Sequence, residues 1–173
     1  MAEKSVTVWT IDHRLGTFFG AETPRGLCAL TIPVHSGRDF ALLLDRRAPG
    51  AEPVTVAPEA TASGRQLLAW LAGQSRELDA PLDLAGLTEF TVAVMRAVAE
   101  IPFGQTRGYG AIARQVGRPG AARAVGQVMH RNPVPLFVPC HRVLGSGGGL
   151  CGFGAGLPMK QALLEMEQGG RLL

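Results

Sequence analysis

With 173 residues, 46% of them hydrophobic, the chain is long enough to bury a real core in one compact body or two small lobes, which excludes a disordered protein. The N-terminus has no basic segment followed by an apolar signal core, and no stretch approaches the roughly 18 apolar residues that cross a bilayer, so we expect a cytoplasmic protein without a membrane partner. Cys28, Cys140 and Cys151 form an odd set without CxxC spacing, so the sequence predicts neither a disulfide framework nor a metal site.

Positive charge is concentrated in the second half of the chain. Residues 1–84 carry 8 basic and 10 acidic side chains, whereas residues 85–173 carry 9 basic and 4 acidic ones. Between positions 101 and 164 there is no acidic residue, but there are seven basic ones: Arg107, Arg114, Arg118, Arg123, Arg131, Arg142 and Lys160. This pattern indicates a polyanionic partner, although an ordinary solvated surface would carry the same charges.

The first third of the chain has the pattern of a small antiparallel sheet. Strand-like runs at 7–11, 27–32 and 40–44 are separated by Gly, Pro and charged turns. Residues 48–58 contain three prolines and are predicted to be a connection, and residues 64–71 have helical periodicity. A linker at 78–86 then separates a predicted N-terminal sheet domain, 1–80, from a second domain, 87–173.

The second domain begins with helical patterns. Thr88 is a plausible N-cap for a helix whose apolar residues recur at helical spacing as far as Ile101, and Pro102 ends it. Further helices are predicted at 109–116 and 121–130, joined by a Gly-Arg-Pro-Gly turn at 117–120. This is the outline of a helix-turn-helix, but most helix pairs of this kind only pack together, so the outline alone is weak support for DNA binding.

The third of these helices has an unusual surface. Arg123, Gln127 and His130 share one polar face, and the positions around them hold small residues, including Ala122 and Gly126. Glycine inside a helix costs about 1 kcal/mol relative to alanine, so a reason for Gly126 in packing or in ligand binding is expected. The pattern indicates close approach to another surface, although tight packing within the protein would explain it as well.

A candidate reactive thiol follows. Residues 134–138 are predicted to be a buried strand that Pro139 ends, which leaves Cys140 at a strand end. Most free cysteines are merely small buried hydrophobes, but the cationic neighbours His141 and Arg142 are expected to lower the thiol pKa. Because neighbouring side chains on a strand point to opposite faces, His141 is expected to reach the sulfur through a bridging water.

The chain continues with a glycine-rich run at 145–156 and a helix that Pro158 opens and Gly169 closes. Lys160 and Glu167 are seven residues apart and therefore lie on one face of that helix. Glu167 can then orient a histidine while Lys160 reaches the loop, although a Lys and a Glu on such a helix are commonly exposed and structural.

Several motifs together resemble one family. These are Ile101-Pro102-Phe103-Gly104, Tyr109-Gly110, Ala122-Arg123-Ala124-Val125-Gly126, Arg131-Asn132-Pro133 and, above all, Pro139-Cys140-His141-Arg142-Val143. They closely resemble the O6-alkylguanine-DNA alkyltransferases, also called methylated-DNA-protein-cysteine methyltransferases, collinearly over residues 87–169. The resemblance implies an α/β (α+β) protein, in which a small ribonuclease H-like sheet domain precedes a mainly helical domain with a helix-turn-helix and the reactive cysteine.

The resemblance also implies roles for individual residues. Cys140 would accept the alkyl group, His141 would act as the base through a water, Glu167 would orient the histidine, and Asn132 would be a hinge. In duplex DNA Arg123 would replace the extruded nucleotide and Tyr109 would help to rotate it, with the recognition helix entering the minor groove through Ala122, Gly126 and Gln127. A flipped base is required, because a sulfur cannot reach O6 of a stacked, paired guanine. The substrate pocket would be formed by Pro135, Met129, Val143, Leu150, Phe153, Gly154 and Lys160.

One position departs from the family pattern. Where the family usually has a Gly-Tyr pair in the glycine-rich loop, this chain has Gly152-Phe153. The missing hydroxyl is one that could bond O6 or stabilise the departing proton, so a slower reaction or a shifted substrate preference is expected.

The implied function is direct-reversal DNA repair without a cofactor: a single irreversible transfer of an alkyl group from O6-alkylguanine in duplex DNA to Cys140, by a monomer. Activity on O4-alkylthymine and cooperative binding to DNA stay open. One alternative is a non-catalytic alkyltransferase-like protein that only binds lesions, although such relatives lack the cysteine. A helix-turn-helix transcription regulator and a cysteine hydrolase are further alternatives, and no oxyanion-hole signature supports the latter.

Overall fold

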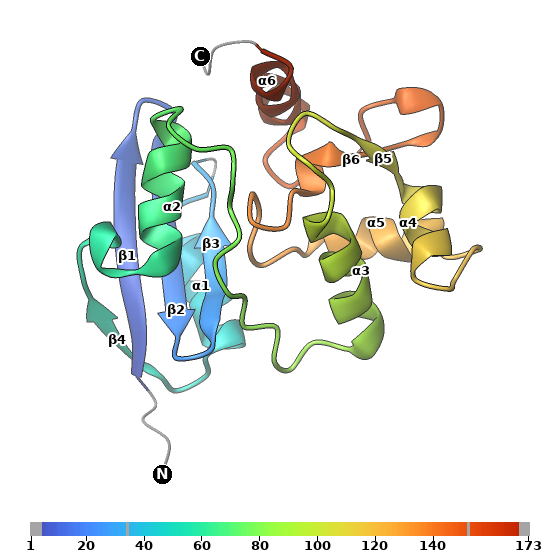
Figure 1. Cartoon of the computed structure of the whole chain (residues 1–173). Helices are drawn as coiled ribbons and strands as arrows, with labels where there is room; N and C mark the ends of the chain where they lie inside the picture. The colour runs from blue at the N-terminus through green and yellow to red at the C-terminus, as the bar shows by residue number, and fades with distance from the viewer. Residues whose placement is uncertain (1–4, 34, 152, 170–173) are drawn as a thin grey trace. The chain divides into compact units, whose positions relative to one another are not determined.

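The computed structural model describes residues 5–33, 35–151 and 153–169 (Figure 1). The chain divides into two compact units, residues 1–86 and 87–173. Sheet and helices occur together, and the predicted α+β class is confirmed. None of the helices in the described ranges is long and apolar enough to cross a membrane.

The first unit is built on a four-stranded mixed sheet with the strand order β3-β2-β1-β4. Strands β1 to β3 are antiparallel neighbours, and β4 runs parallel to β1 at the edge. The elements of this unit are β1 (Ser5–His13), β2 (Gly16–Thr23), β3 (Gly26–Thr31), α1 (Gly37–Arg47), β4 (Glu52–Thr55), the 3-10 turn η1 (Pro58–Ala60) and α2 (Ala62–Leu71).

The two helices of this unit cover opposite faces of the sheet, with α2 in front and α1 behind in Figure 1. On the α1 face, Phe40 and Leu44 pack against a cluster that includes Val6 and Ala21. Successive strand residues point to opposite faces, so Trp9 points to the α2 face. There it fills the space beside Gly20, where any added Cβ would overlap the indole ring.

The predicted strand at 40–44 is wrong, because these residues lie inside α1. The N-cap Ser36 and Asp39 form a capping box, with each side chain bonding the other residue's backbone amide. Arg46 and Arg47 lie in the last turn, where cations favour a helix. The connection predicted at 48–58 contains β4 and the start of η1, and β2 had not been predicted at all.

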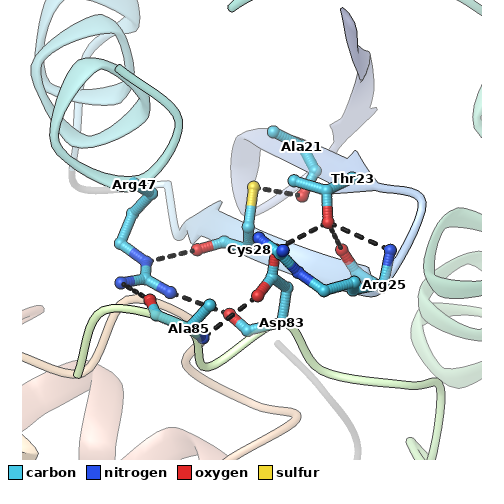
Figure 2. A network of polar contacts seen from close by, with 8 residues as sticks. Ala21, Thr23, Arg25, Cys28, Arg47, Asp83 and Ala85 are labelled. Carbon is cyan, nitrogen blue, oxygen red and sulfur yellow. Dashed lines mark hydrogen bonds and ion pairs between the residues drawn. The ribbon is translucent and has the colours of Figure 1, made fainter. Parts of the chain in front are cut away.

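Residues 80–86, which belong to the linker predicted at 78–86, are attached to β3. Leu27 N donates to Pro81 O at 2.8 Å and Asp83 N donates to Leu27 O at 2.9 Å. Figure 2 shows the side chains that complete this attachment: Asp83 accepts from Thr23 and Arg25, and Arg47 donates to the carbonyl oxygens of Cys28, Asp83 and Ala85. The segment therefore belongs to the first unit.

The second unit is mainly helical. Its elements are α3 (Glu89–Ala99), β5 (Arg107–Gly108), α4 (Tyr109–Gln115), α5 (Ala122–His130), the 3-10 turn η2 (Cys140–Arg142), β6 (Val143–Leu144), the 3-10 turn η3 (Ser146–Gly148) and α6 (Leu157–Glu167). Thr88 caps α3 by accepting from Thr91 N, as predicted. Helices α4 and α5 pack on each other and both contact α3, while β5 and β6 form a short parallel pair.

The segment 134–138 is buried as predicted but is not a strand, so Cys140 does not lie at a strand end. Val138 N donates to Val134 O at 3.0 Å, which closes a turn, and Leu136 has a φ of 73°. Pro133, Pro135 and Pro139 remove three backbone donors that a sheet ladder would need. Cys140 instead begins η2, and His141 and Arg142 follow it in the same turn.

Candidate functional site

Cys140 is a buried thiol at the start of a tight turn. Only 5% of the residue is exposed, and its backbone N donates to Val138 O at 2.7 Å. Burial raises the pKa of the Cys140 thiol, although a hydrogen bond from Asn132 and the charge of Lys160 oppose this. The lowered thiol pKa expected from the sequence is therefore wrong for the free protein, and the sulfur needs a base to remove its proton.

His141 directly follows Cys140 and is held from one side of its ring. Its Nε2 lies 2.7 Å from Glu167 Oε1, and its Nδ1 is buried without a hydrogen-bond partner among the described residues. Burial lowers the pKa of His141 more than the neighbouring Glu167 raises it, so the ring is neutral. An ionised carboxylate can only accept, so Nε2 carries the proton and Nδ1 presents a free lone pair.

Glu167 is held as an anion. Burial works to raise the pKa of its carboxyl group, but hydrogen bonds from His141 and Arg142 outweigh this and lower the pKa to about 2. Gly104 N also donates to its Oε2, at 3.1 Å. These contacts fix the last turn of α6 against both η2 and the loop after α3.

Arg142 has a role that the sequence did not reveal. Its Nε lies 2.9 Å from Glu167 Oε2 and its Nη2 lies 2.8 Å from Oε1, so the guanidinium forms a bidentate ion pair with the carboxylate. The expectation had been that Arg142 acts on the neighbouring thiol. Its partner is 25 positions away, and sequence spacing gave no sign of that contact.

Lys160 is completely buried and joins the residues before the glycine-rich run to the middle of that run. Its Nζ donates to Val143 O at 2.7 Å and to Cys151 O at 3.0 Å. Burial lowers the pKa of this ammonium. Lys160 therefore closes residues 143–151 into a loop beside Cys140.

Asn132 links the end of α5 to the turn that precedes the thiol. Its Nδ2 donates to Val138 O at 2.8 Å, and its Oδ1 accepts from Val134 N at 3.0 Å. Both sides of the amide are used, so the helix end and the buried turn are held in a fixed geometry.

The residues predicted to line a substrate pocket differ in exposure. Met129, Pro135 and Val143 are buried, Leu150 and Phe153 are half-buried, and Gly154 is exposed. Gly152, the partner of Phe153 in the departure from the family pattern, lies outside the described residues.

A groove of about 890 Å³ runs between α4, α5 and the glycine-rich loop. The five residues predicted to bind DNA all line it: Tyr109, Ala122, Arg123, Gly126 and Gln127. The groove is also lined by Arg107 and Arg114, which the sequence had named only as part of the basic half of the chain. Sequence reasoning did not single out Ser146, because a groove wall formed by separate elements leaves no local pattern. Among the described residues Cys151, an exposed thiol, lines the groove and Cys140 does not.

The face of α5 that lines the groove is polar, and small residues keep it thin, meaning that few side-chain atoms cover the helix backbone there. Val125 and Met129 are buried on one side of the helix, whereas Arg123, Gln127 and His130 are exposed on the other. A Cβ added at Gly126 would come no closer than 3.9 Å to its nearest neighbour, the Tyr109 ring. Packing within the described residues therefore does not require the glycine.

Comparisons with known proteins agree with this arrangement. Residues 89–169 match the family model for the 6-O-methylguanine DNA methyltransferase DNA-binding domain. The methylated-DNA--protein-cysteine methyltransferase of Mycobacterium bovis is 52% identical over 103 residues, which are 60% of this chain and 62% of that relative. The protein of the same name from Mycolicibacterium paratuberculosis is 45% identical over 153 residues, 85% of this chain and 89% of the relative.

A solved structure, Mycobacterium tuberculosis OGT in complex with DNA, is 39% identical and superimposes with a TM-score of 0.76, covering 94% of this chain and 93% of that one. The fold and the cysteine, histidine and glutamate site define a class of thiol group-transfer proteins. The chain belongs to the methylated-DNA--protein-cysteine methyltransferase family.

Proposed function

We propose that this protein repairs DNA by moving an alkyl group from O6-alkylguanine to its own Cys140. The Cys140 thiolate attacks the alkyl carbon, a sulfur–carbon bond forms, and the bond between that carbon and O6 breaks. Guanine leaves with the electron pair and takes up a proton, and the product is S-alkylcysteine. A thioether is not a nucleophile of this kind, so each molecule acts once, and no cofactor takes part.

The observation that carries this proposal is the free Nδ1 of His141 in a ring that is locked from its other side. Glu167 fixes the Nε2–H tautomer, so the lone pair of Nδ1 is available for the thiol proton. Because the buried Cys140 rests as a thiol, it must lose its proton before it attacks, and in the proposed reaction this proton passes to His141 through a bridging water. Glu167 then stabilises the imidazolium that forms.

The proposed substrate is duplex DNA from which the alkylated nucleotide has been rotated. A stacked base cannot present O6 to a buried sulfur, so the base leaves the helix and its place is taken by Arg123, while Tyr109 crowds the target phosphate. Both residues lie in the groove, whose thin α5 face suits close approach to DNA. A cytoplasmic monomer is sufficient for this reaction.

Phe153 is the position at which this chain departs from the usual family pattern, and it bears on the proposed reaction. It offers no hydroxyl to the departing guanine, so the leaving group relies on other donors, and we expect Phe153→Tyr to accelerate transfer. A thiol that stayed protonated would favour the lesion-binding alternative, and burial raises the pKa of the Cys140 thiol.

The fate of the lesion tests the proposal. A duplex with one O6-methylguanine is incubated with increasing amounts of protein, and the nucleosides are quantified after digestion. We expect unmodified guanine to appear in a yield that never exceeds one per protein molecule. Cys151→Ser, which removes the thiol that lines the groove, should repair as the wild type does, whereas Cys140→Ser should bind the DNA without repairing it. Selective binding by the wild type with no restored guanine would instead establish a lesion binder.

A further inference from the structure

The Glu167 carboxylate is shared between a neutral base and a permanent cation. His141 Nε2 lies 2.7 Å from Oε1, and the Arg142 guanidinium contacts both carboxylate oxygens at distances from 2.8 to 3.1 Å. All three side chains are buried. The group therefore carries two opposite charges that cancel and an imidazole that is neutral at rest.

Arg142 is itself fixed in place. Its Nη1 donates to Ile101 O at 2.6 Å, and its guanidinium carbon lies 5.7 Å from the centre of the Phe103 ring. A guanidinium held on three sides cannot turn toward solvent or toward the neighbouring thiol. Its charge stays beside Glu167.

This placement has a consequence for His141. A buried carboxylate at hydrogen-bond distance favours the imidazolium form and opposes the lowering of the His141 pKa by burial, so it raises the lowest pH at which Nδ1 has a lone pair. A cation on the same carboxylate opposes this effect. The other charged or titratable groups facing His141 are Lys160 on α6, whose positive charge acts in the same direction as Arg142, and Cys140 in the same turn, which is a neutral thiol at rest.

We propose that Arg142 is a positioning residue that holds Glu167 against His141 and offsets the charge of Glu167, so that Arg142 and burial together keep His141 as the neutral base. The inference rests on the proposed alkyl transfer, in which His141 must accept the thiol proton. Arg142 does not touch the substrate. It helps to set the lowest pH at which His141 is unprotonated and able to accept the thiol proton.

The test is the pH dependence of single-turnover alkyl transfer in the full chain, together with an NMR titration of the His141 ring, which needs no substrate. Arg142→Gln keeps polar groups near Glu167 but removes the positive charge. We expect the acidic limb of the rate profile, and the His141 titration with it, to move to higher pH by about one to two units. Arg142→Lys keeps the positive charge but loses the bidentate contact with Glu167. It should leave the acidic limb of the rate profile close to its wild-type position.

The opposite change gives an independent check if Arg142→Gln does not fold. Glu167→Gln leaves Arg142 without its counter-charge, so the His141 titration should move to lower pH, and adding Arg142→Gln in that background should bring it back up. Arg96→Gln, which removes an exposed arginine on α3, is the matched control for net charge and should not move the limb.

The outcomes separate this inference from the proposed function. If the wild type transfers an alkyl group and its acidic limb stays in place in Arg142→Gln, the inference is wrong and Arg142 has a purely structural role. Equal losses in Arg142→Gln and Arg142→Lys at every pH would lead to the same conclusion. If the wild type transfers nothing while His141 titrates as expected, the proposed function fails and the electrostatic role of Arg142 stands.

Discussion

At the scale of single residues, Glu167 connects the chemistry of the site to the stability of the fold. The pKa of its carboxyl group is lowered to about 2 in the folded protein, whereas an exposed glutamate in the unfolded chain titrates near its ordinary value of 4.5. The folded state therefore binds this proton less readily than the unfolded state does. The resulting stabilisation is complete above the unfolded pKa and is lost as the pH falls toward 2.

This difference predicts acid sensitivity that depends on one side chain. On the order of 3 kcal/mol of the free energy of unfolding should disappear between neutral pH and pH 2 in the wild type, and this loss should be much smaller in Glu167→Gln. Urea titrations at several pH values measure it. Glu165→Gln, an exposed glutamate of the same helix, is the control. Equal acid sensitivity in the wild type and Glu167→Gln would contradict the assignment.

The sequence anticipated the pairing of some of these residues but not of others. The seven-residue spacing of Lys160 and Glu167 predicted a shared helix face, and the structure directs both side chains to the segment around Cys140. The thiol environment was predicted wrongly. Adjacent cations in a sequence do not show which way they point, and burial, which dominates the Cys140 pKa, is a property of the folded chain.

At the scale of elements, α5 carries a glycine that packing alone does not explain. Because a Cβ at Gly126 meets no atom closer than 3.9 Å, Gly126→Ala should raise the free energy of unfolding by about 0.5–1 kcal/mol, the usual gain for this change inside a helix. Thermal or urea unfolding measures the gain.

The affinity for duplex DNA should depend on the size of the side chain at position 126. Gly126→Leu should fold, since the side chain points into the groove, but it should weaken binding to duplex DNA at least tenfold in a fluorescence anisotropy titration. Ala124→Leu is the matched control, because Ala124 is exposed on the same helix but does not line the groove. Unchanged affinity in Gly126→Leu would mean that the thin face of α5 does not approach DNA.

The segment 80–86 gives a second prediction at this scale. The guanidinium of Arg47 donates to three backbone carbonyls that join α1, β3 and this segment, as Figure 2 shows. Arg47→Met should leave these carbonyls without their donor and cost about 1–3 kcal/mol. Hydrogen exchange at Leu27 and Asp83 should accelerate. Arg46→Met, a change at the exposed neighbour, should alter neither quantity.

The elements themselves were partly predictable. Helices α3, α4, α5 and α6 were predicted within one or two residues, because caps, prolines and apolar spacing agree there. The strand predicted at residues 40–44 was wrong because Phe-Ala-Leu-Leu-Leu suits a helix or a strand, and the capping box at Ser36 favours the helix. The apolar run at residues 134–138 predicted burial correctly. The strand predicted there was wrong, because the prolines in and around the run prevent strand pairing.

At the scale of the whole molecule, the chain combines a sheet unit with a helical unit that contains both the groove and the buried thiol. The net positive charge of the chain belongs to the helical unit, since residues 85–173 carry 9 basic and 4 acidic side chains, whereas residues 1–84 carry 8 basic and 10 acidic ones. The predicted polyanionic partner and the proposed transfer chemistry therefore concern the same half of the chain. Separate from it, Cys28 is fully buried in the sheet, and burial raises its pKa to about 11, so it does not compete as a nucleophile.

The central claim is that Cys140 becomes alkylated, and the mass of the intact protein tests it most directly. After incubation with a duplex that contains one O6-methylguanine, the wild type should gain one methyl group in place of one hydrogen, and peptide mapping should locate it on Cys140. Cys140→Ser should gain nothing. A wild-type protein that binds the lesion and keeps its original mass, or one that carries the methyl group on Cys151, would contradict the account.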